Sequence, residues 1–175
     1  MTAAGGRELT LVLGGARSGK SRYAESRISR HPPPWLYIAT AEAGDAEMAA
    51  RIAAHKARRG ADWISIEAPR DLPGVLAGHA NMPILVDCLT LWLSNLMRAE
   101  ADADAEFARL ERALEQARGP VALVANEVGC GIVPDNALAR RFRDLQGVLN
   151  QRLAARADCV VLVVAGLPLF VKGTG

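Results

Sequence analysis

Short apolar runs, rich in β-branched and aromatic residues, recur along the chain between longer stretches with helical spacing. Most of these runs are continuously apolar instead of alternating, which is typical of strands covered by helices on both faces. Strands that alternate with helices in this way are typical of α/β proteins with a mainly parallel sheet. The six predicted strands are Leu9–Leu13, Trp35–Ala39, Trp63–Ile66, Ile84–Asp87, Val121–Asn126 and Cys159–Ala165.

Four of the intervening stretches have the apolar spacing or the end signals of helices. The predicted helices are Gly19–Arg30, Asp45–Arg59, Asp104–Arg118 and Asp135–Ala157. The last of them carries an apolar stripe that we expect to belong to the core. The stripe consists of Leu138, Phe142, Leu145, Leu149 and Leu153. A further stretch, Leu89–Met97, is apolar on all sides and fits a buried helix or a subunit contact equally well.

The composition is that of an ordinary globular protein. The 175 residues are 50% hydrophobic and 23% charged, which excludes disorder and low-complexity repeats and predicts a single domain over residues 1–175. No apolar run approaches the roughly 18 residues of a membrane-spanning helix, and the first residues do not resemble a signal peptide. We therefore expect no membrane span and a cytoplasmic location. The three cysteines, Cys88, Cys130 and Cys159, lack CxxC spacing and are expected to be buried thiols.

The net charge is only +2, but it is distributed unevenly. Residues 1–60 carry 10 basic and 5 acidic groups, whereas residues 61–120 carry 5 basic and 10 acidic groups. Aromatic residues make up only 5% of the chain. This pattern predicts a local anion site in the first third of the chain and no nucleic-acid partner.

The phosphate loop is the clearest motif. Residues 14–21, Gly-Gly-Ala-Arg-Ser-Gly-Lys-Ser, satisfy G-x-x-x-x-G-K-[ST] directly after a predicted strand and directly before a predicted helix. The glycines let backbone N–H groups converge on one phosphate, and the helix N-terminus adds a favourable dipole. We expect Lys20 to reach the β and γ phosphates and the Ser21 hydroxyl to ligate Mg²⁺.

Such a loop requires a carboxylate near the metal. The apolar strand ending in Asp87 supplies one at the edge of the sheet where ligands bind. An Asp in this position can also be the N-cap of the next helix. Glu127, which follows the next predicted strand, is the alternative ligand. These features indicate an NTP-dependent enzyme, either a small-molecule kinase or an ATPase module.

A lone histidine, His55, lies on the border between the apolar and basic sides of the predicted helix Asp45–Arg59. Lys56, Arg58 and Arg59 follow it at once. A neutral imidazole among cations suits nucleophilic attack on phosphorus. The same pattern also fits a solvated basic helix end, where cations are favoured by the helix dipole.

Together these residues resemble the family of bifunctional adenosylcobinamide kinase / adenosylcobinamide-phosphate guanylyltransferases of cobalamin biosynthesis. The similarity covers nearly the whole chain after Arg7. The combination of Asn-Glu-Val-Gly with Gly-Ile-Val-Pro is the specific part. Besides the phosphate loop, the matching segments are Tyr37-Ile38-Ala39-Thr40, Glu47-Met48 through Arg51-Ile52 to His55, Asp87-Cys88-Leu89-Thr90, Asn126-Glu127-Val128-Gly129, Gly131-Ile132-Val133-Pro134 and Asn150-Gln151-Arg152-Leu153.

The resemblance implies a RecA-like P-loop fold and two reactions in one chain. ATP or GTP first phosphorylates the aminopropanol hydroxyl of adenosylcobinamide. GTP then donates GMP to the phosphate of that product, which gives adenosyl-GDP-cobinamide and pyrophosphate. In the family GMP passes through a covalent bond to a histidine, and His55 is the matching position. Family members assemble as trimers, so we also expect a homotrimer.

The resemblance implies the site residues as well. His55 and Lys20 are expected to be catalytic, and Ser21 and Asp87 are expected to hold Mg²⁺. The residues expected to contact the nucleotide are Gly14, Gly15, Ala16, Arg17, Ser18, Gly19, Lys20, Ser21, Ala39, Thr40, Lys56, Ala57, Arg58, Arg59, Glu67 and Asp87.

Two other functions fit parts of the pattern. A P-loop kinase of another pathway would keep its NTP-dependent activity after His55→Ala. A RecA-like ATPase or nucleic-acid-binding module would show salt-dependent DNA binding.

Overall fold

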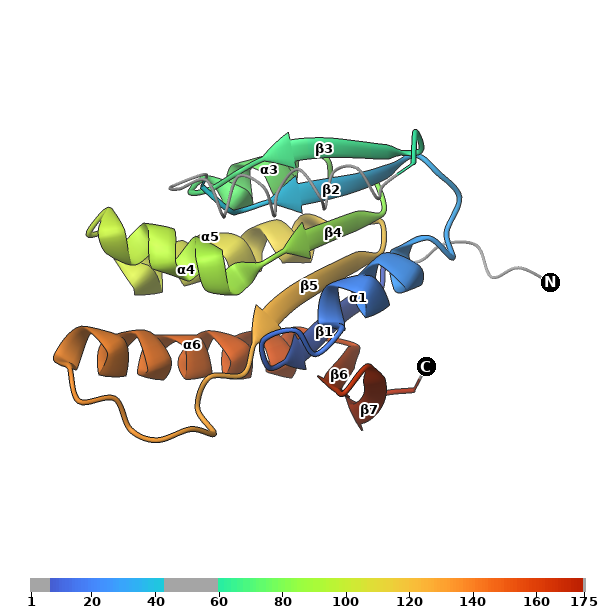
Figure 1. Ribbon diagram of the computed structural model, residues 1–175. Coiled ribbons are helices and arrows are strands. Elements are labelled where there is room, and N and C mark those ends of the chain that lie inside the picture. The colour runs from blue at the N-terminus through green and yellow to red at the C-terminus, as the bar shows by residue number, and fades with distance from the viewer. Residues whose placement is uncertain (1–6, 43–59, 175) are drawn as a thin grey trace.

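The structure is a computed structural model that describes residues 7–42 and 60–174. It contains a seven-stranded sheet with the order β3-β2-β4-β5-β1-β6-β7 (Figure 1). The strands are β1 (Leu9–Gly14), β2 (Trp35–Ala39), β3 (Trp63–Glu67), β4 (Ile84–Asp87), β5 (Val121–Asn126), β6 (Cys159–Val164) and β7 (Leu167–Lys172). The helices are α1 (Lys20–Ile28), α3 (Leu72–Gly78), α4 (Leu89–Arg98), α5 (Ala103–Gln116) and α6 (Ala137–Arg156).

The six predicted strands are all present, with ends that differ by one residue at most. Every pairing among them is parallel, and only β7 runs antiparallel, beside β6. The prediction of a mainly parallel sheet is therefore confirmed. β7 was not predicted. It is paired on one edge only and exposed at all six positions, so it lacks the burial that marks the other strands.

Helices cover both faces of the sheet, as the apolar strands predicted. α1 packs on one face, where Ala24 and Ile28 contact strand residues such as Val12 and Val124. The other described helices cover the opposite face, where their apolar residues form a larger core around Trp92 and Phe107. Figure 1 shows α1 separated from these helices by the sheet. None of the described helices is long and apolar enough to cross a membrane.

The helix predictions were confirmed in part. α1 ends two residues before the predicted Arg30, and α5 and α6 lie within the predicted ranges apart from the start of α5 at Ala103. Leu89–Met97 is a buried helix, because Trp92 and Leu93 are fully enclosed in the core. The predicted helix Asp45–Arg59 lies outside the described residues.

Two predictions about burial were wrong. Leu138 is 68% exposed, because it lies in the first turn of α6, whereas Leu149 and Leu153 further along the helix are buried. Cys130 is exposed, because it lies in the loop between β5 and α6, while Cys88 and Cys159 are buried as expected.

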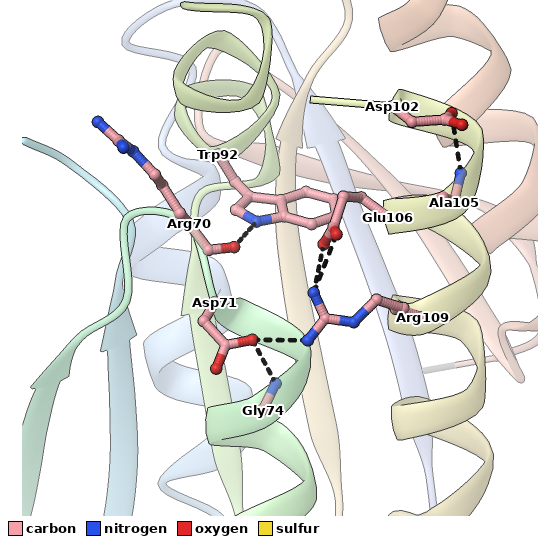
Figure 2. Close-up of polar contacts among 8 residues, drawn as sticks. All are labelled: Arg70, Asp71, Gly74, Trp92, Asp102, Ala105, Glu106 and Arg109. Atoms are coloured by element: carbon pink, nitrogen blue, oxygen red, sulfur yellow. Dashed lines mark hydrogen bonds and ion pairs between the residues drawn. The ribbon is translucent and has the colours of Figure 1, made fainter. Parts of the chain in front are cut away.

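Polar contacts join the helices of the larger core (Figure 2). Asp71 caps α3 by accepting from the Gly74 N–H, and it also accepts from Arg109 of α5 at 2.9 Å. The indole N–H of Trp92 donates to the Arg70 carbonyl at 2.8 Å. The short helix α3 was not predicted, because Pro73 and Gly74 weaken its helical signal. Its cap and its contact with α5 supply the stability that its sequence lacks.

Candidate functional site

The phosphate loop joins β1 to α1 at the carboxyl edge of the sheet, as predicted. Gly19 has a φ of 96°, in the left-handed region that favours glycine. At Gly14, an added Cβ would lie 2.5 Å from the Ser18 Oγ and 2.7 Å from the Val163 carbonyl oxygen. The turn after β6 holds the loop from outside, because the Gly166 N–H donates to the Ser18 carbonyl at 2.8 Å. The loop is therefore closely packed at its start and held at its centre.

Lys20 begins α1 inside this loop. Its Nζ donates to the Gly15 carbonyl at 2.9 Å. Burial lowers the pKa of Lys20, while the neighbouring Cys88 and Asp87 act in the opposite direction. A phosphate anion at this position would favour the charged ammonium and offset the cost of its burial. The structure thus brings Lys20 and Asp87 together, although 67 positions separate them in the sequence.

Three of the predicted site residues lie in one register row at the carboxyl edge. Ala39 of β2 pairs with Glu67 of β3 on one side and with Asp87 of β4 on the other. Tyr37 donates from its hydroxyl to Asp87 Oδ2 at 3.0 Å. The contact from Tyr37 was not predicted, because the pairing of β2 with β4 is not local in the sequence. This hydrogen bond fixes the position of the Asp87 carboxylate at the edge of the sheet.

Thr40 lies directly beyond this row but is fully buried. Its Oγ1 donates to the Cys88 carbonyl at 2.6 Å and accepts from the Cys88 N–H at 2.9 Å. Its carbonyl accepts from the Asn95 side chain at 2.7 Å. These bonds fix the turn between β4 and α4, and contact of Thr40 with a nucleotide stays a prediction.

Asp87 and Glu127 differ in what their carboxylates do. The Glu127 Oε1 accepts from the Gly129 N–H at 2.6 Å, so this carboxylate is engaged within its own turn. The Glu127 backbone N–H donates to the Gly14 carbonyl at 3.2 Å, which places the chain beside the start of the phosphate loop. The Asp87 carboxylate is near enough to Lys20 to oppose the lowering of its pKa by burial, whereas the Glu127 carboxylate is engaged in its own turn, so Asp87 is favoured as the carboxylate of the candidate site.

Cys88 lies next to Asp87 and close to Lys20. Burial raises the pKa of its thiol to about 11, and the Asp87 carboxylate acts in the same direction. The thiol therefore stays protonated near neutral pH and is a poor nucleophile. The cis peptide bond between Asp87 and Cys88 falls at the junction of β4 and α4.

Five predicted site residues cannot be placed. His55, Lys56, Ala57, Arg58 and Arg59 lie outside the described residues. Their roles stay predictions. The described part of the predicted site consists of the phosphate loop, which includes Lys20 and Ser21, and the register row of Glu67, Ala39 and Asp87, with Thr40 beyond it.

Comparison with solved structures supports the fold. The chain is similar to a structure reported as "Structural and biochemical analysis of a prototypical ATPase from the type III secretion system of pathogenic bacteria", with a TM-score of 0.57 and 13% identity. The match covers 91% of this chain, which spans about half (52%) of the length of that structure. The α/β P-loop fold predicted from the sequence is therefore confirmed.

Comparison with known sequences identifies the family. A relative from Pseudomonas aeruginosa, named bifunctional adenosylcobalamin biosynthesis protein CobP, is 47% identical over 93% of this chain and 96% of its own length. The CobU proteins of Salmonella typhimurium and Escherichia coli, which carry the same bifunctional name, are 45% and 40% identical over 94% of this chain and 99% of theirs. The family model described as cobinamide kinase / cobinamide phosphate guanyltransferase matches residues 10–171. The chain therefore belongs to the cobinamide kinase / cobinamide phosphate guanyltransferase family.

Proposed function

We propose that this chain performs both reactions of its family on adenosylcobinamide. In the first, the aminopropanol hydroxyl of adenosylcobinamide takes the γ-phosphoryl group of ATP or GTP. In the second, GMP from GTP is transferred to the phosphate of that product, and pyrophosphate leaves. The observation that carries the proposal is the phosphate loop with Asp87 near Lys20, in a chain that matches the family over residues 10–171.

The described residues fit a nucleoside triphosphate. The Ser18 Oγ is buried and has no hydrogen-bond partner within residues 7–42 and 60–174. A phosphate oxygen would satisfy this hydroxyl. Lys20 would supply the positive charge that the β and γ phosphates require, and the N-terminus of α1 adds backbone donors. We propose that residues 14–21 bind the triphosphate and that Ala39, Thr40, Glu67 and residues 56–59 line the rest of the site.

The residues present also fit Mg²⁺. The Asp87 carboxylate lies at the edge beside Lys20, and the Ser21 hydroxyl lies in the first turn of α1. Hydroxyl and carboxylate oxygens are the ligands that Mg²⁺ prefers. When bound, Mg²⁺ would neutralise charge on the phosphates and on the leaving group. Tyr37 keeps the Asp87 carboxylate in place through its hydroxyl.

We propose that His55 carries GMP between the two substrates of the second reaction. An imidazole nitrogen attacks the α-phosphorus of GTP, a P–N bond forms, and the bond to the β-phosphate oxygen breaks to release pyrophosphate. A phosphate oxygen of adenosylcobinamide phosphate then attacks the same phosphorus, and the P–N bond breaks. This divides one difficult displacement into two easier ones.

The family also suggests the oligomeric state and the cellular location of the enzyme. We propose that it assembles as a homotrimer, as its family members do, and that it acts in the cytoplasm, where its nucleotide substrates are available. Analytical ultracentrifugation would measure the oligomeric state, and a monomer at working concentration would contradict this part of the proposal.

The test is incubation of wild type and His55→Ala with Mg²⁺ and GTP labelled at the α-phosphate. Intact-mass analysis after denaturation should find GMP on the wild type alone, in an acid-labile and base-stable linkage. Labelling of His55→Ala would place the nucleophile elsewhere. If neither protein is labelled but the wild type phosphorylates adenosylcobinamide, the transferase activity is absent or needs its corrinoid substrate before the covalent bond forms.

A further inference from the structure

We propose, on the basis of the function proposed above, that Asn126 is a further catalytic residue of the kinase step, and that Thr90 and Asn150 are positioning residues that hold it. The Asn126 amide would donate to the phosphoryl group as it transfers from ATP or GTP to the hydroxyl of adenosylcobinamide. The proposal rests on the place of Asn126 in the sheet and on the bonds to its peptide.

Asn126 ends β5, and β5 lies between β4, which ends in Asp87, and β1, which leads into the phosphate loop. In register, Asn126 is paired with Gly14, the first residue of that loop. Neighbouring strands lie about 4.8 Å apart, so Asn126 is within side-chain reach of the loop. Asp87 is paired with Val124, so Asn126 projects one pleat further toward the edge than the Asp87 carboxylate.

The Asn126 side chain points to the face that carries α1. Side chains alternate along β5, with Ala122 and Val124 in the core beneath α1 and Leu123 and Ala125 in the opposite core. By the same period, Asn126 belongs to the α1 face. Lys20, which begins α1, and Ser18, whose Oγ lies over Gly14, are on this face too.

The backbone of Asn126 is held by side chains from two helices. Its N–H donates to the Thr90 Oγ1 of α4 at 2.8 Å, and its carbonyl accepts from the Asn150 Nδ2 of α6 at 3.1 Å. Gln146 donates to the Asn150 Oδ1 at 2.9 Å and fixes the orientation of that amide. Thr90, Asn150 and Gln146 are all buried. These contacts join three motif segments that lie far apart in the sequence.

The Asn126 side chain, in contrast, is half-buried and makes no hydrogen bond with any of the residues that the structure describes. A fixed backbone with an unengaged amide at its end is an arrangement suited to binding a ligand. An amide is neutral, so it can donate to phosphoryl oxygens beside Lys20 without competing with the Asp87 carboxylate for a cation. Donors fixed in advance near the transferring group stabilise charge in the transition state.

The first experiment compares wild type, Asn126→Ala and Asn126→Asp, with Gln151→Ala as the matched control, because Gln151 is an exposed neighbour of Asn150. We expect Asn126→Ala to lower kcat of adenosylcobinamide phosphorylation by roughly 10²-fold. GDP affinity and KM for adenosylcobinamide should change less than threefold. Asn126→Asp should lose more activity than Asn126→Ala, because a carboxylate repels the phosphates. Gln151→Ala should match the wild type.

Either of two results would overturn this role of Asn126. One is an unchanged kcat in Asn126→Ala. The other is a parallel loss of GDP affinity and kcat, which would indicate a structural role. A wild type that does not phosphorylate adenosylcobinamide would instead refute the proposed function, so the two failures can be told apart.

The second experiment tests positioning. Thr90→Val removes the hydroxyl that accepts from the Asn126 N–H, and Thr90→Ser retains a hydroxyl. We expect Thr90→Val to lower kcat about tenfold at nearly constant KM, and Thr90→Ser to restore most of it. In the Asn126→Ala background Thr90→Val should cause little further loss, because residues that act through one group are not additive. If Thr90→Val lowered kcat by the same factor in the Asn126→Ala background as in the wild type, the positioning role of Thr90 would be overturned.

Discussion

The two faces of the sheet are built for different tasks. On the face of α1, a small core supports the phosphate loop, and the polar groups of Lys20, Asp87 and Tyr37 gather at its edge. On the opposite face, α3, α4, α5 and α6 enclose a larger core, and ion pairs join α5 to α3 and to α6. The proposed site thus lies on the face with the smaller core, whereas the larger apolar core lies on the other face. Substitutions on the two faces should therefore separate activity from stability.

The largest effect is expected at Lys20. Lys20→Ala removes the cation beside Asp87 and should lower the rate of adenosylcobinamide phosphorylation by about 10³-fold. Thermal unfolding should be nearly unchanged, because Lys20 contributes to a ligand site and not to a core. Arg141→Ala, an exposed substitution on α6, is the control. An equal loss in both variants would contradict the separation of the two faces.

The strongest effect on stability is expected at Trp92, which is fully buried in the larger core and bonded to the Arg70 carbonyl. Trp92→Ala should lower the free energy of unfolding by about 3–5 kcal/mol. Urea unfolding measures this loss. The folded fraction of Trp92→Ala should still bind GTP as the wild type does. Far weaker GTP binding would contradict the separation of activity and stability between the two faces.

Two adjacent glycines of the phosphate loop test how tightly the loop is packed on the α1 face. A methyl group on Gly14 would overlap the Ser18 Oγ and the Val163 carbonyl, whereas on Gly15 it would meet nothing within 4 Å. Gly14→Ala should weaken GTP binding about tenfold to a hundredfold, since overpacking costs about 1–3 kcal/mol. Gly15→Ala should leave binding within about threefold. Isothermal titration of both variants checks this, and equal losses would mean that the loop is not packed as described.

The smallest effect is expected in the ion pair between α5 and α6. Arg152 donates to Glu111 at 2.6 Å and lowers the pKa of that carboxyl, and Arg156 acts in the same direction. Glu111→Gln should cost about 1.5 kcal/mol of unfolding free energy at pH 7. Because the folded-state pKa is lowered, the stabilisation is present above the ordinary pKa of Glu and is lost as the pH falls through the lowered one. The two proteins should thus converge in acid, and a constant difference down to pH 2 would exclude the charge as its cause.

The sequence predicted the fold well where signals are local. The apolar strands, and the phosphate loop with its flanking strand and helix, can be recognised in short segments. A buried strand produces a local apolar run, and the phosphate loop produces a local glycine motif. α3 was missed because it depends on a distant partner, α5. β7 pairs with its direct neighbour β6, and it was missed because its six exposed positions lack the burial that marks the other strands.

The same distinction applies to the site. Lys20 and Asp87 were predicted from motifs, and the structure brings them together. Three sets of hydrogen bonds could not be predicted. They join Tyr37 to Asp87, Thr40 to Cys88, and Thr90 and Asn150 to the backbone of Asn126. Each joins residues 24 to 50 positions apart, and no local pattern records such a pairing.

The hydrogen bond from the Gly166 N–H to the Ser18 carbonyl has a consequence for folding of the chain during its synthesis on the ribosome. β1 is among the first segments to leave the ribosome, yet it is flanked in the sheet by β5 and β6. The loop that follows β1 therefore lacks its neighbours until residues 121–126 and 159–166 have been translated. Since contacts of such long sequence separation form late, the nascent chain should acquire nucleotide binding among its last folding events. A ligand of the finished enzyme would thus have little to bind during most of its synthesis.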